Sequence, residues 1–366
     1  ASCAATQDIC DGLDNNCNGN TDENFKPPIL NQGYLGQACA SDDGVTPKHG
    51  LCQQTGTFRC SGTSATSCQN SSGTPIAGVK RPCGTGTGQS GYPCDEVCDG
   101  LDNDCDGLVD EPPWNKGTGT GAAYWVKPDI VKLGTQNVWM HRYEASRPNA
   151  TTTSPGTGNG WWRGTNMRAA QPVPPTGTTL DKTTACSVPN KVPWFNITGP
   201  EAQHVCVEMG GRLCRNSEWQ TGCRSTSNTC RWGFATNCST FTTSINWTTC
   251  NLGPFDFNQA VPGNQDGLLP TASNRIPNCY ANWGSTTNRF YDITGNLREL
   301  TCAAGGSPSA PCTATSTSFT LMGGAFNTAD PTGEGAACDF TFYNVSGTFK
   351  LFDVGFRCCF DSDPTI

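Results

Sequence analysis

Histidine, methionine and charged residues are all scarce in this chain. Its 366 residues include three His and four Met, and only 15% are charged. So few imidazoles disfavour an iron or copper site built from a His cluster, and the lack of any CxxC pair argues against thiolate metal clusters. No apolar run approaches the roughly 20 residues that span a bilayer. No basic patch offsets the net charge of −8, which disfavours nucleic acid as a partner.

Cysteine, glycine and proline are abundant instead. The chain has 24 Cys, 43 Gly and 25 Pro. So many cysteines, irregularly spaced, favour disulfides formed in an oxidising compartment, and the glycines and prolines favour a loop-rich backbone. The chain begins with ASC, which is typical of a mature end after signal-peptide cleavage. We therefore predict an extracellular or cell-surface protein in which cross-links replace part of the hydrophobic core.

Composition divides the chain into a Cys-rich region (1–112), a Pro- and Gly-rich linker (113–123) and a larger domain (124–366). The larger domain holds nine of the ten Trp and is the part able to build a core. Eleven Cys precede the linker and thirteen follow it. Because both counts are odd, full oxidation needs at least one bridge between the parts or between two chains. Adjacent Cys358 and Cys359 should reach two different partners, and one of them is our candidate for the crossing bridge. A local Cys302–Cys312 pair is also plausible.

Two acidic stretches repeat at an offset of 88 residues. Residues 8–23 read DICDGLDNNCNGNTDE, and residues 96–111 read EVCDGLDNDCDGLVDE. Oxygen-bearing side chains at every second residue, followed by a glycine turn, can wrap one hard cation. Pro113 stands where an EF-hand needs Glu, so we predict calcium loops of another kind. The predicted ligands are Asp99, Asp102, Asp104, Asp106, Leu108, Asp110 and Glu111, and in the first copy Asp11, Asp14, Asn16, Asn18, Asn20, Asp22 and Glu23.

The first copy should bind its cation more weakly, because Asn16 and Asn18 replace two carboxylates. An alternative is a cluster of Asx turns that only caps loops, but carboxylates this dense repel one another unless a cation lies between them. The motif CDGxDNxCxGxxDE resembles the metal-binding repeat of MopE-like bacterial surface proteins, which implies metal binding at both copies.

Two helices and several short strands are predicted after the linker. Thr198 and Glu201 form a capping-box pattern, and apolar residues recur on one helical face until Gly210 and Gly211. A second helix should start near Asn216, with Trp219 and Cys223 directed inward. Strands are expected at 288–294, 319–326 and 353–359, and residues 149–179 look like a long surface excursion.

Four motifs in sequence order resemble the formylglycine-generating-enzyme, or sulfatase-modifying-factor, family. They are GGRLCRNSEWQTGCR (210–224), YDITGNLREL (291–300), LMGGAF (321–326) and VGFRC (354–358), and HRYEASRP (141–148) matches an early strand. The resemblance implies a loop-rich α+β fold related to C-type lectins. Catalytic members carry two Cys shortly after the glycine motif, whereas 323–342 contains only Cys338. We therefore expect no enzymatic activity.

The resemblance also implies two further calcium sites. One of the implied ligands is Glu299, whose alternative role is a buried salt bridge with Arg298 or Arg357. The scattered His49, His141 and His204 are poor metal-site candidates, and His204 should be a surface or packing residue. The implied calcium ligands are Asp292, Gly295, Leu297 and Glu299 in one set and Asn251, Leu252, Asp266 and Leu268 in the other.

Three functions remain open from the sequence. The first is a non-catalytic surface protein, stiffened by calcium and disulfides, that serves adhesion or assembly into an extracellular layer or filament. The second is a lectin-like module that binds a glycan or a peptide, and the third is a diverged enzyme or a copper-handling protein. Trp161 and Trp162 either contact a partner or pin their loop to the domain. Possible partners are other copies of the chain or cell-surface glycans.

Overall fold

The computed structural model describes more than half of the chain and divides it into two compact units. The small unit comprises 1–94, 101–108 and 163–166, and the large unit comprises the rest. The described residues are 7–25, 35–40, 55–76, 98–99, 110, 126–156, 184–234, 245–256, 260, 267–303, 311–313 and 316–365.

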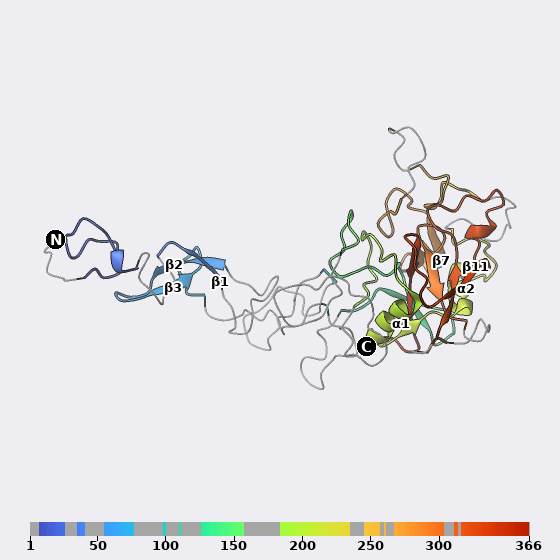
Figure 1. Ribbon diagram of the computed structural model, residues 1–366, viewed down its shortest axis with the longest axis horizontal. Helices are drawn as coiled ribbons and strands as arrows, with labels where there is room; N and C mark the ends of the chain where they lie inside the picture. Colours follow the sequence, from blue (N-terminus) through green and yellow to red (C-terminus); the bar gives the residue numbers. More distant parts are fainter. Residues whose placement is uncertain are drawn as a thin grey trace. The chain divides into compact units, whose positions relative to one another are not determined.

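The small unit contains a three-stranded antiparallel sheet in the order β1-β2-β3, drawn in blue in Figure 1. A disulfide joins Cys10 in the first acidic repeat to Cys60 at the end of β2. The repeat ends in a short 3-10 helix, so the loop is anchored to the sheet at one point and closed by a helical turn at the other. The elements are β1 (Ala38–Ala40), β2 (Thr55–Cys60), β3 (Thr66–Gln69) and the 3-10 helix η1 (Glu23–Phe25).

Both predicted helices of the large unit are confirmed. Helix α1 (Gly199–Glu208) starts after Thr198, whose side chain and that of Glu201 make the predicted capping box. Helix α2 (Asn216–Cys223) buries Trp219 and Cys223. Local capping and one apolar face are sufficient to define these elements, which is why the sequence predicts them.

Short strands build the rest of the large unit. Two four-stranded sheets have the orders β4-β5-β13-β6 and β11-β10-β9-β12, and β7 and β8 form a hairpin. The fold is thus loop-rich α+β, as expected. The strands are β4 (Ile130–Lys132), β5 (Trp139–His141), β6 (Arg212–Leu213), β7 (Tyr280–Ser285), β8 (Asn288–Tyr291), β9 (Arg298–Thr301), β10 (Ser318–Met322), β11 (Thr341–Ser346), β12 (Val354–Phe356) and β13 (Cys358–Phe360), with a 3-10 helix η5 (Glu334–Ala336).

The strand predicted at 353–359 is divided between the two sheets. β12 pairs in parallel with β9, whereas β13 pairs antiparallel with β5 and β6. Arg357 lies between them, buried, with its Nε donating to Glu299 at 2.8 Å. The chain therefore changes sheets at the residue whose guanidinium is held by the protein interior.

Two disulfides fix strand β13 to its neighbours. Cys358 pairs with Cys206 of α1, and Cys359 pairs with Cys214 beside β6. Successive strand residues point to opposite faces, and these two cysteines indeed belong to separate core clusters. The prediction of two different partners is confirmed, as is Cys302–Cys312.

The predicted crossing bridge is in another place. Neither Cys358 nor Cys359 crosses the linker; Cys98 does, by pairing with Cys186. Thr184, two residues before Cys186, also donates its hydroxyl to the carbonyl of Asp110. Residues 95–100 and 109–111 accordingly group with the large unit rather than with the region that precedes the linker.

Candidate functional site

The first acidic repeat is a loop organised by its own carboxylates. Asp22, at a positive φ of 51°, accepts the backbone N–H of Asp11 at 3.1 Å and that of Gly12 at 3.1 Å. Asp14 accepts the N–H groups of Asn18 and Gly19. These contacts bend the chain into a compact loop, and one region of the loop gathers several oxygen-bearing side chains.

Three predicted ligands converge in that region. The Nδ2 atoms of Asn16 and Asn18 both donate to Oε1 of Glu23, each at 2.7 Å. Their amide oxygens are occupied, because Asn16 Oδ1 accepts the N–H of Asn18 and Asn18 Oδ1 accepts that of Asn20. A cation here would have to take these single amide oxygens away from the turns. A carboxylate has two oxygens and can serve the turn and the cation together.

Asp8 is a further candidate ligand that the sequence analysis missed. It is buried, its Oδ1 accepts the N–H groups of Asn15 and Asn16, and its Oδ2 has no hydrogen-bond partner. Oε2 of Glu23 is likewise buried and unpartnered. Sharing of a proton with the Glu23 carboxyl, more than the backbone N–H donors, lowers the pKa of Asp8. The available signal was that Glu96 occupies the equivalent place in the second copy.

The described part of the second repeat has the same backbone geometry as the first. Asp110 has a φ of 50°, and its Oδ1 accepts the N–H of Asp99 at 3.1 Å, as Asp22 does for Asp11. Cys98 is buried in a disulfide, as Cys10 is. The other predicted ligands of this copy lie outside the described residues: Asp102, Asp104, Asp106, Leu108 and Glu111.

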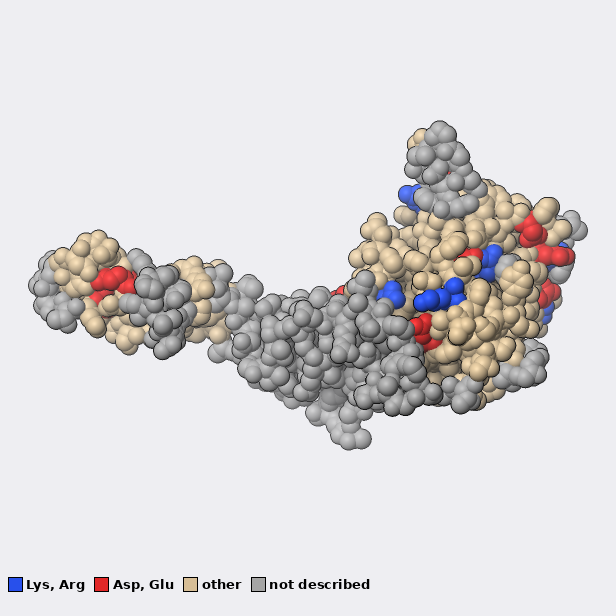
Figure 2. Space-filling view, in the orientation of Figure 1, with Lys and Arg blue, Asp and Glu red and all other residues tan. Residues whose placement is uncertain are grey.

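Sulfur does not contribute to a metal site in the first repeat. The side chains of Cys10, Asp22 and Cys60 lie within 4.8 Å of one another. The two cysteines are bonded to each other, so neither offers a thiolate. Any cation at this repeat must be held by oxygen. On the face shown in Figure 2, acidic side chains gather on the small unit.

We expect the two copies to differ in calcium affinity, because Asn16 and Asn18 of the first copy stand where the second copy has Asp104 and Asp106. The variant D102N/D104N/D106N should lose one high-affinity site, whereas N16A/N18A should change the titration little. The matched gain-of-function variant N16D/N18D should tighten the first site by about tenfold or more, because affinity follows the number of ligand charges. Isothermal titration with calcium measures all three. An unchanged stoichiometry in D102N/D104N/D106N would contradict the assignment.

A second candidate site lies in the interior of the large unit. The carboxyls of Glu144, Asp292 and Glu299 are all buried close to one guanidinium, that of Arg357. Burial raises the pKa of each carboxyl, that of Asp292 to about 6. In the case of Glu144, the nearby Asp292 adds to the rise. A cluster with more carboxylates than cations favours an added positive charge.

The two implied ligand carboxylates of this cluster differ in their surroundings. Glu299 accepts from Arg357 Nε at 2.8 Å and from Trp219 Nε1 at 2.8 Å, so each oxygen already has a donor. This is the salt-bridge alternative. Asp292 accepts the N–H of Ala272 with Oδ2, while Oδ1 is buried without a partner. Only Asp292 therefore offers an open oxygen of the kind that a cation would satisfy.

The two implied calcium sets lie side by side. A Cβ at Gly295 would meet the carbonyl oxygen of Asn251 at 2.5 Å, and Gly295 has a positive φ of 88°. The Nδ2 of Asn251 donates to Oδ1 of Asn296, and the Nδ2 of Asn296 donates to Glu144 at 2.6 Å. The N–H of Leu297 also donates to Glu144. The structure describes Leu252 and Leu268, but Asp266 lies outside the described residues, as do Trp161 and Trp162.

The segment after Gly323-Gly324 is filled by structural contacts. Its only cysteine, Cys338, is bonded to Cys223 of α2. Arg298 forms a buried ion pair with Asp353 and donates to Asn327 and to Thr328. This stretch, which in the catalytic members carries the reactive cysteines, here contributes a disulfide to α2 and accepts two hydrogen bonds from Arg298.

The described histidines do not form a metal site. His141 is fully buried beside Phe360, and burial lowers its pKa to about 3, so it is neutral at physiological pH. His204 lies on α1 with Nε2 4.0 Å from Glu208, which fits the packing role predicted for it. His49 lies outside the described residues.

Comparison with known proteins supports the interpretation of the two acidic repeats as metal-binding motifs. The family model Cu-binding_MopE, described as "Putative metal-binding motif", matches residues 4–23 and 94–111. The MopE-like resemblance is therefore confirmed at both copies, although the identity of the metal is not fixed by it. No curated protein matches the chain.

Solved structures similar to this one are distant in sequence. PvdO from Pseudomonas aeruginosa is 13% identical, with 61% of this chain and 79% of that chain covered and a TM-score of 0.34. Treponema denticola variable protein 1 is 12% identical, with 64% and 92% covered and a TM-score of 0.36. The major tropism determinant U1 variant is 12% identical, with 61% and 50% covered and a TM-score of 0.29. Likeness at this level says nothing about activity.

Proposed function

We propose that this chain is a secreted, non-catalytic surface protein with a structural role in adhesion or in assembly of an extracellular layer or filament. The observation that carries this proposal is the pair of disulfides formed by adjacent residues of β13. Cys358 and Cys359 bind the last strand to α1 and to the segment beside β6 at once. Removal of one native disulfide from a small secreted domain typically costs about 2–5 kcal/mol. A fold stabilised in this way suits a protein that must stay folded outside the cell.

An extracellular location accords with this chemistry. Disulfides persist in oxidising compartments, and the structure pairs cysteines in both units. None of the helices in the described part of the chain is long and apolar enough to cross a membrane.

Calcium is the cation that we propose for the acidic loops. The open atoms at the first repeat are carboxylate oxygens of Asp8 and Glu23, and oxygen-only sets select hard cations. Copper is disfavoured, because it prefers imidazole or sulfur ligands. The described histidines are buried or packed on α1, and Cys10 and Cys60 are bonded to each other. Each bound calcium would stabilise the folded state by mass action.

Electron microscopy of the native secreted material tests the structural role. Ordered fibres or sheets that disperse when calcium is chelated would support assembly. Dispersed particles at every concentration and calcium level would contradict it.

The same material, heated with and without a chelator, should unfold at a markedly lower temperature when calcium is removed.

We also expect the protein to fail as a formylglycine-generating enzyme, with or without copper. Formation of formylglycine from a peptide cysteine needs a reactive thiol on the enzyme, and Cys338 is held in a disulfide with Cys223. Mass spectrometry of a sulfatase-type cysteine peptide after incubation measures the conversion. Turnover that disappears in Cys338→Ser, but survives in the matched variant Cys302→Ser, would contradict the proposal.

A further inference from the structure

Asn246 lies in an exposed turn of the large unit that has no part in the proposed structural role. The sequence Asn246-Trp247-Thr248 has the form N-x-S/T, which is the acceptor sequence for N-linked glycans in secreted proteins. Asn246 and Thr248 are exposed, whereas Trp247 packs partly buried against a core cluster. The chain contains six sequences of this form, so the motif alone does not select one of them. Their asparagines are Asn70, Asn149, Asn196, Asn237, Asn246 and Asn344.

The turn brings the two side chains of the motif together. Oδ1 of Asn246 accepts the backbone N–H of Thr248 at 3.1 Å and the hydroxyl of Thr248 at 2.8 Å. The N–H of Thr249 donates to the carbonyl of Asn246, and Cys250 is bonded to Cys279. None of the residues that the structure describes accepts a hydrogen bond from Nδ2 of Asn246. The turn and the disulfide therefore present this nitrogen to solvent in one orientation.

Two other copies of the motif are engaged by the fold. Thr198 donates its hydroxyl to Glu201 in the capping box of α1, so this hydroxyl is committed away from Asn196. Oδ1 of Asn344, on β11, accepts the hydroxyl of Thr320 on the neighbouring strand β10. In these two copies a hydrogen bond to another element replaces the contact between the two side chains of the motif.

The remaining described copies also differ from Asn246. Oδ1 of Asn70 accepts the backbone N–H groups of Ser72 and Thr74, with no bond from the Ser72 hydroxyl among the described contacts. In the copy at Asn149, the hydroxyl oxygen of Thr151 accepts backbone N–H groups further along the chain. Among the copies that the structure describes, the hydroxyl thus donates to its own asparagine at Asn246.

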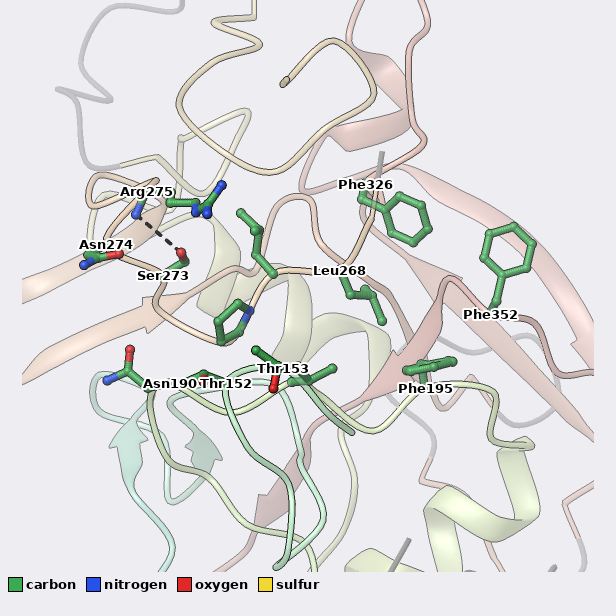
Figure 3. Close-up of a pocket in the computed structure, with 13 residues that line it drawn as sticks. Thr152, Thr153, Asn190, Phe195, Leu268, Ser273, Asn274, Arg275, Phe326 and Phe352 are labelled. Carbon is green, nitrogen blue, oxygen red and sulfur yellow. Dashed lines mark hydrogen bonds between the residues drawn. The ribbon is translucent and has the colours of Figure 1, made fainter. Parts of the chain in front are cut away.

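Exposed asparagines outside the motif provide an internal comparison. Asn190 and Asn274 lie on an open groove of the large unit (Figure 3). Both are exposed, but the residues two positions further on are Val192 and Ile276, which carry no hydroxyl. These two asparagines should therefore stay unmodified although a reagent can reach them.

We propose that Asn246 is a glycosylation site whose co-substrate is an oligosaccharide carried on a lipid pyrophosphate. Nδ2 attacks the anomeric carbon of the first sugar and forms a C–N bond, while the bond from that carbon to the pyrophosphate oxygen breaks. The lipid pyrophosphate leaves with the bonding electrons, and one amide proton passes to a base of the transferase. The hydrogen bond from Thr248 to Oδ1 stabilises the negative charge that develops on the amide as this proton leaves. The inference rests on the extracellular location in the proposed function, and not on the structural role.

Mass spectrometry of the native secreted protein tests the proposal. After reduction, alkylation and proteolysis, the peptide that contains Asn246 should carry the added mass of an oligosaccharide. Peptides that contain Asn190, Asn196 or Asn274 should not. Secreted protein without a sugar at Asn246 would overturn this proposal and leave the structural role untouched. Absence of the protein from the secreted fraction would overturn the location and the glycosylation site together.

Variants expressed in the native host separate the motif from its turn. Asn246→Gln and Thr248→Ala should each lose this glycan, whereas Thr248→Ser keeps a hydroxyl and should retain it. The matched control Asn196→Gln should leave the total glycan mass unchanged. A nonreducing peptide map that still shows the Cys250–Cys279 bridge establishes that each variant has folded. A glycan at Asn246 that persists in Thr248→Ala, or equal occupancy at Asn196 and Asn246, would overturn the role assigned to the hydroxyl.

Discussion

A cut placed between residues 113 and 123 should leave the two fragments of the chain joined until a reductant is added. The bridge between Cys98 and Cys186 spans the linker, so the peptide bond there is not the only covalent connection. It also accounts for the odd cysteine counts, because one crossing pair leaves an even number on each side. Insertion of a specific protease site into the linker, followed by reducing and nonreducing gels, measures the outcome as a full-mass band or two fragments.

The variant Cys98→Ser/Cys186→Ser should separate into two fragments without reductant. The matched variant Cys302→Ser/Cys312→Ser removes a disulfide that lies wholly within the large unit, and its cut fragments should stay joined. Clean separation of the wild-type fragments without reductant, together with titratable thiols, would contradict the crossing bridge. Multimers that collapse on reduction would point to a link between chains instead.

Local signals explain what the sequence predicts correctly. Helix α1 follows from Thr198 and Glu201, three residues apart, and from apolar residues on one face. The acidic loops follow from spacing alone, and the structure places Asn16, Asn18 and Glu23 together as that spacing requires. Each of these inferences depends on residues that are close in the chain.

Long-range contacts explain what the sequence does not predict. The change of sheet at Arg357 depends on Glu299, 58 residues away, and on the carbonyl of Tyr291. The choice of Cys186 as the partner of Cys98 depends on where two distant loops meet. Asp8 is missed because only the structure shows that one of its oxygens has no donor, whereas the sequence shows no more than an acidic residue, Glu96, at the equivalent place in the second copy.

Glu299 and Asp292 should respond in opposite ways to mutation, although the same family resemblance implies both as calcium ligands. Glu299→Gln leaves Arg357 buried without its charged partner, and removal of one member of a buried ion pair costs about 3–5 kcal/mol. We expect this loss of unfolding free energy both in calcium and in a chelator. Denaturant unfolding followed by tryptophan fluorescence measures it. A loss confined to calcium would favour Glu299 as a metal ligand instead.

Asp292→Asn should show the reverse pattern. Its pKa is raised by burial to about 6 from 3.8, so ionisation at neutral pH opposes folding by roughly 3 kcal/mol in the metal-free protein. Since the folded-state pKa lies above the unfolded one, the metal-free wild type should lose stability relative to Asp292→Asn as pH rises from about 4 to 6, with no further change above. The difference between the two curves isolates this carboxyl from Glu144 and Glu299, whose pKa values shift in the same direction.

Calcium should reverse the order of the two proteins. A cation bound at the open Oδ1 of Asp292 would favour the ionised carboxylate, so the wild type should gain stability from calcium that Asp292→Asn does not. The amide retains an oxygen for the N–H of Ala272, which makes the substitution a test of charge rather than of shape. Equal gains in calcium for both proteins would mean that the buried cluster is closed by Arg357 alone and that calcium acts only at the acidic loops.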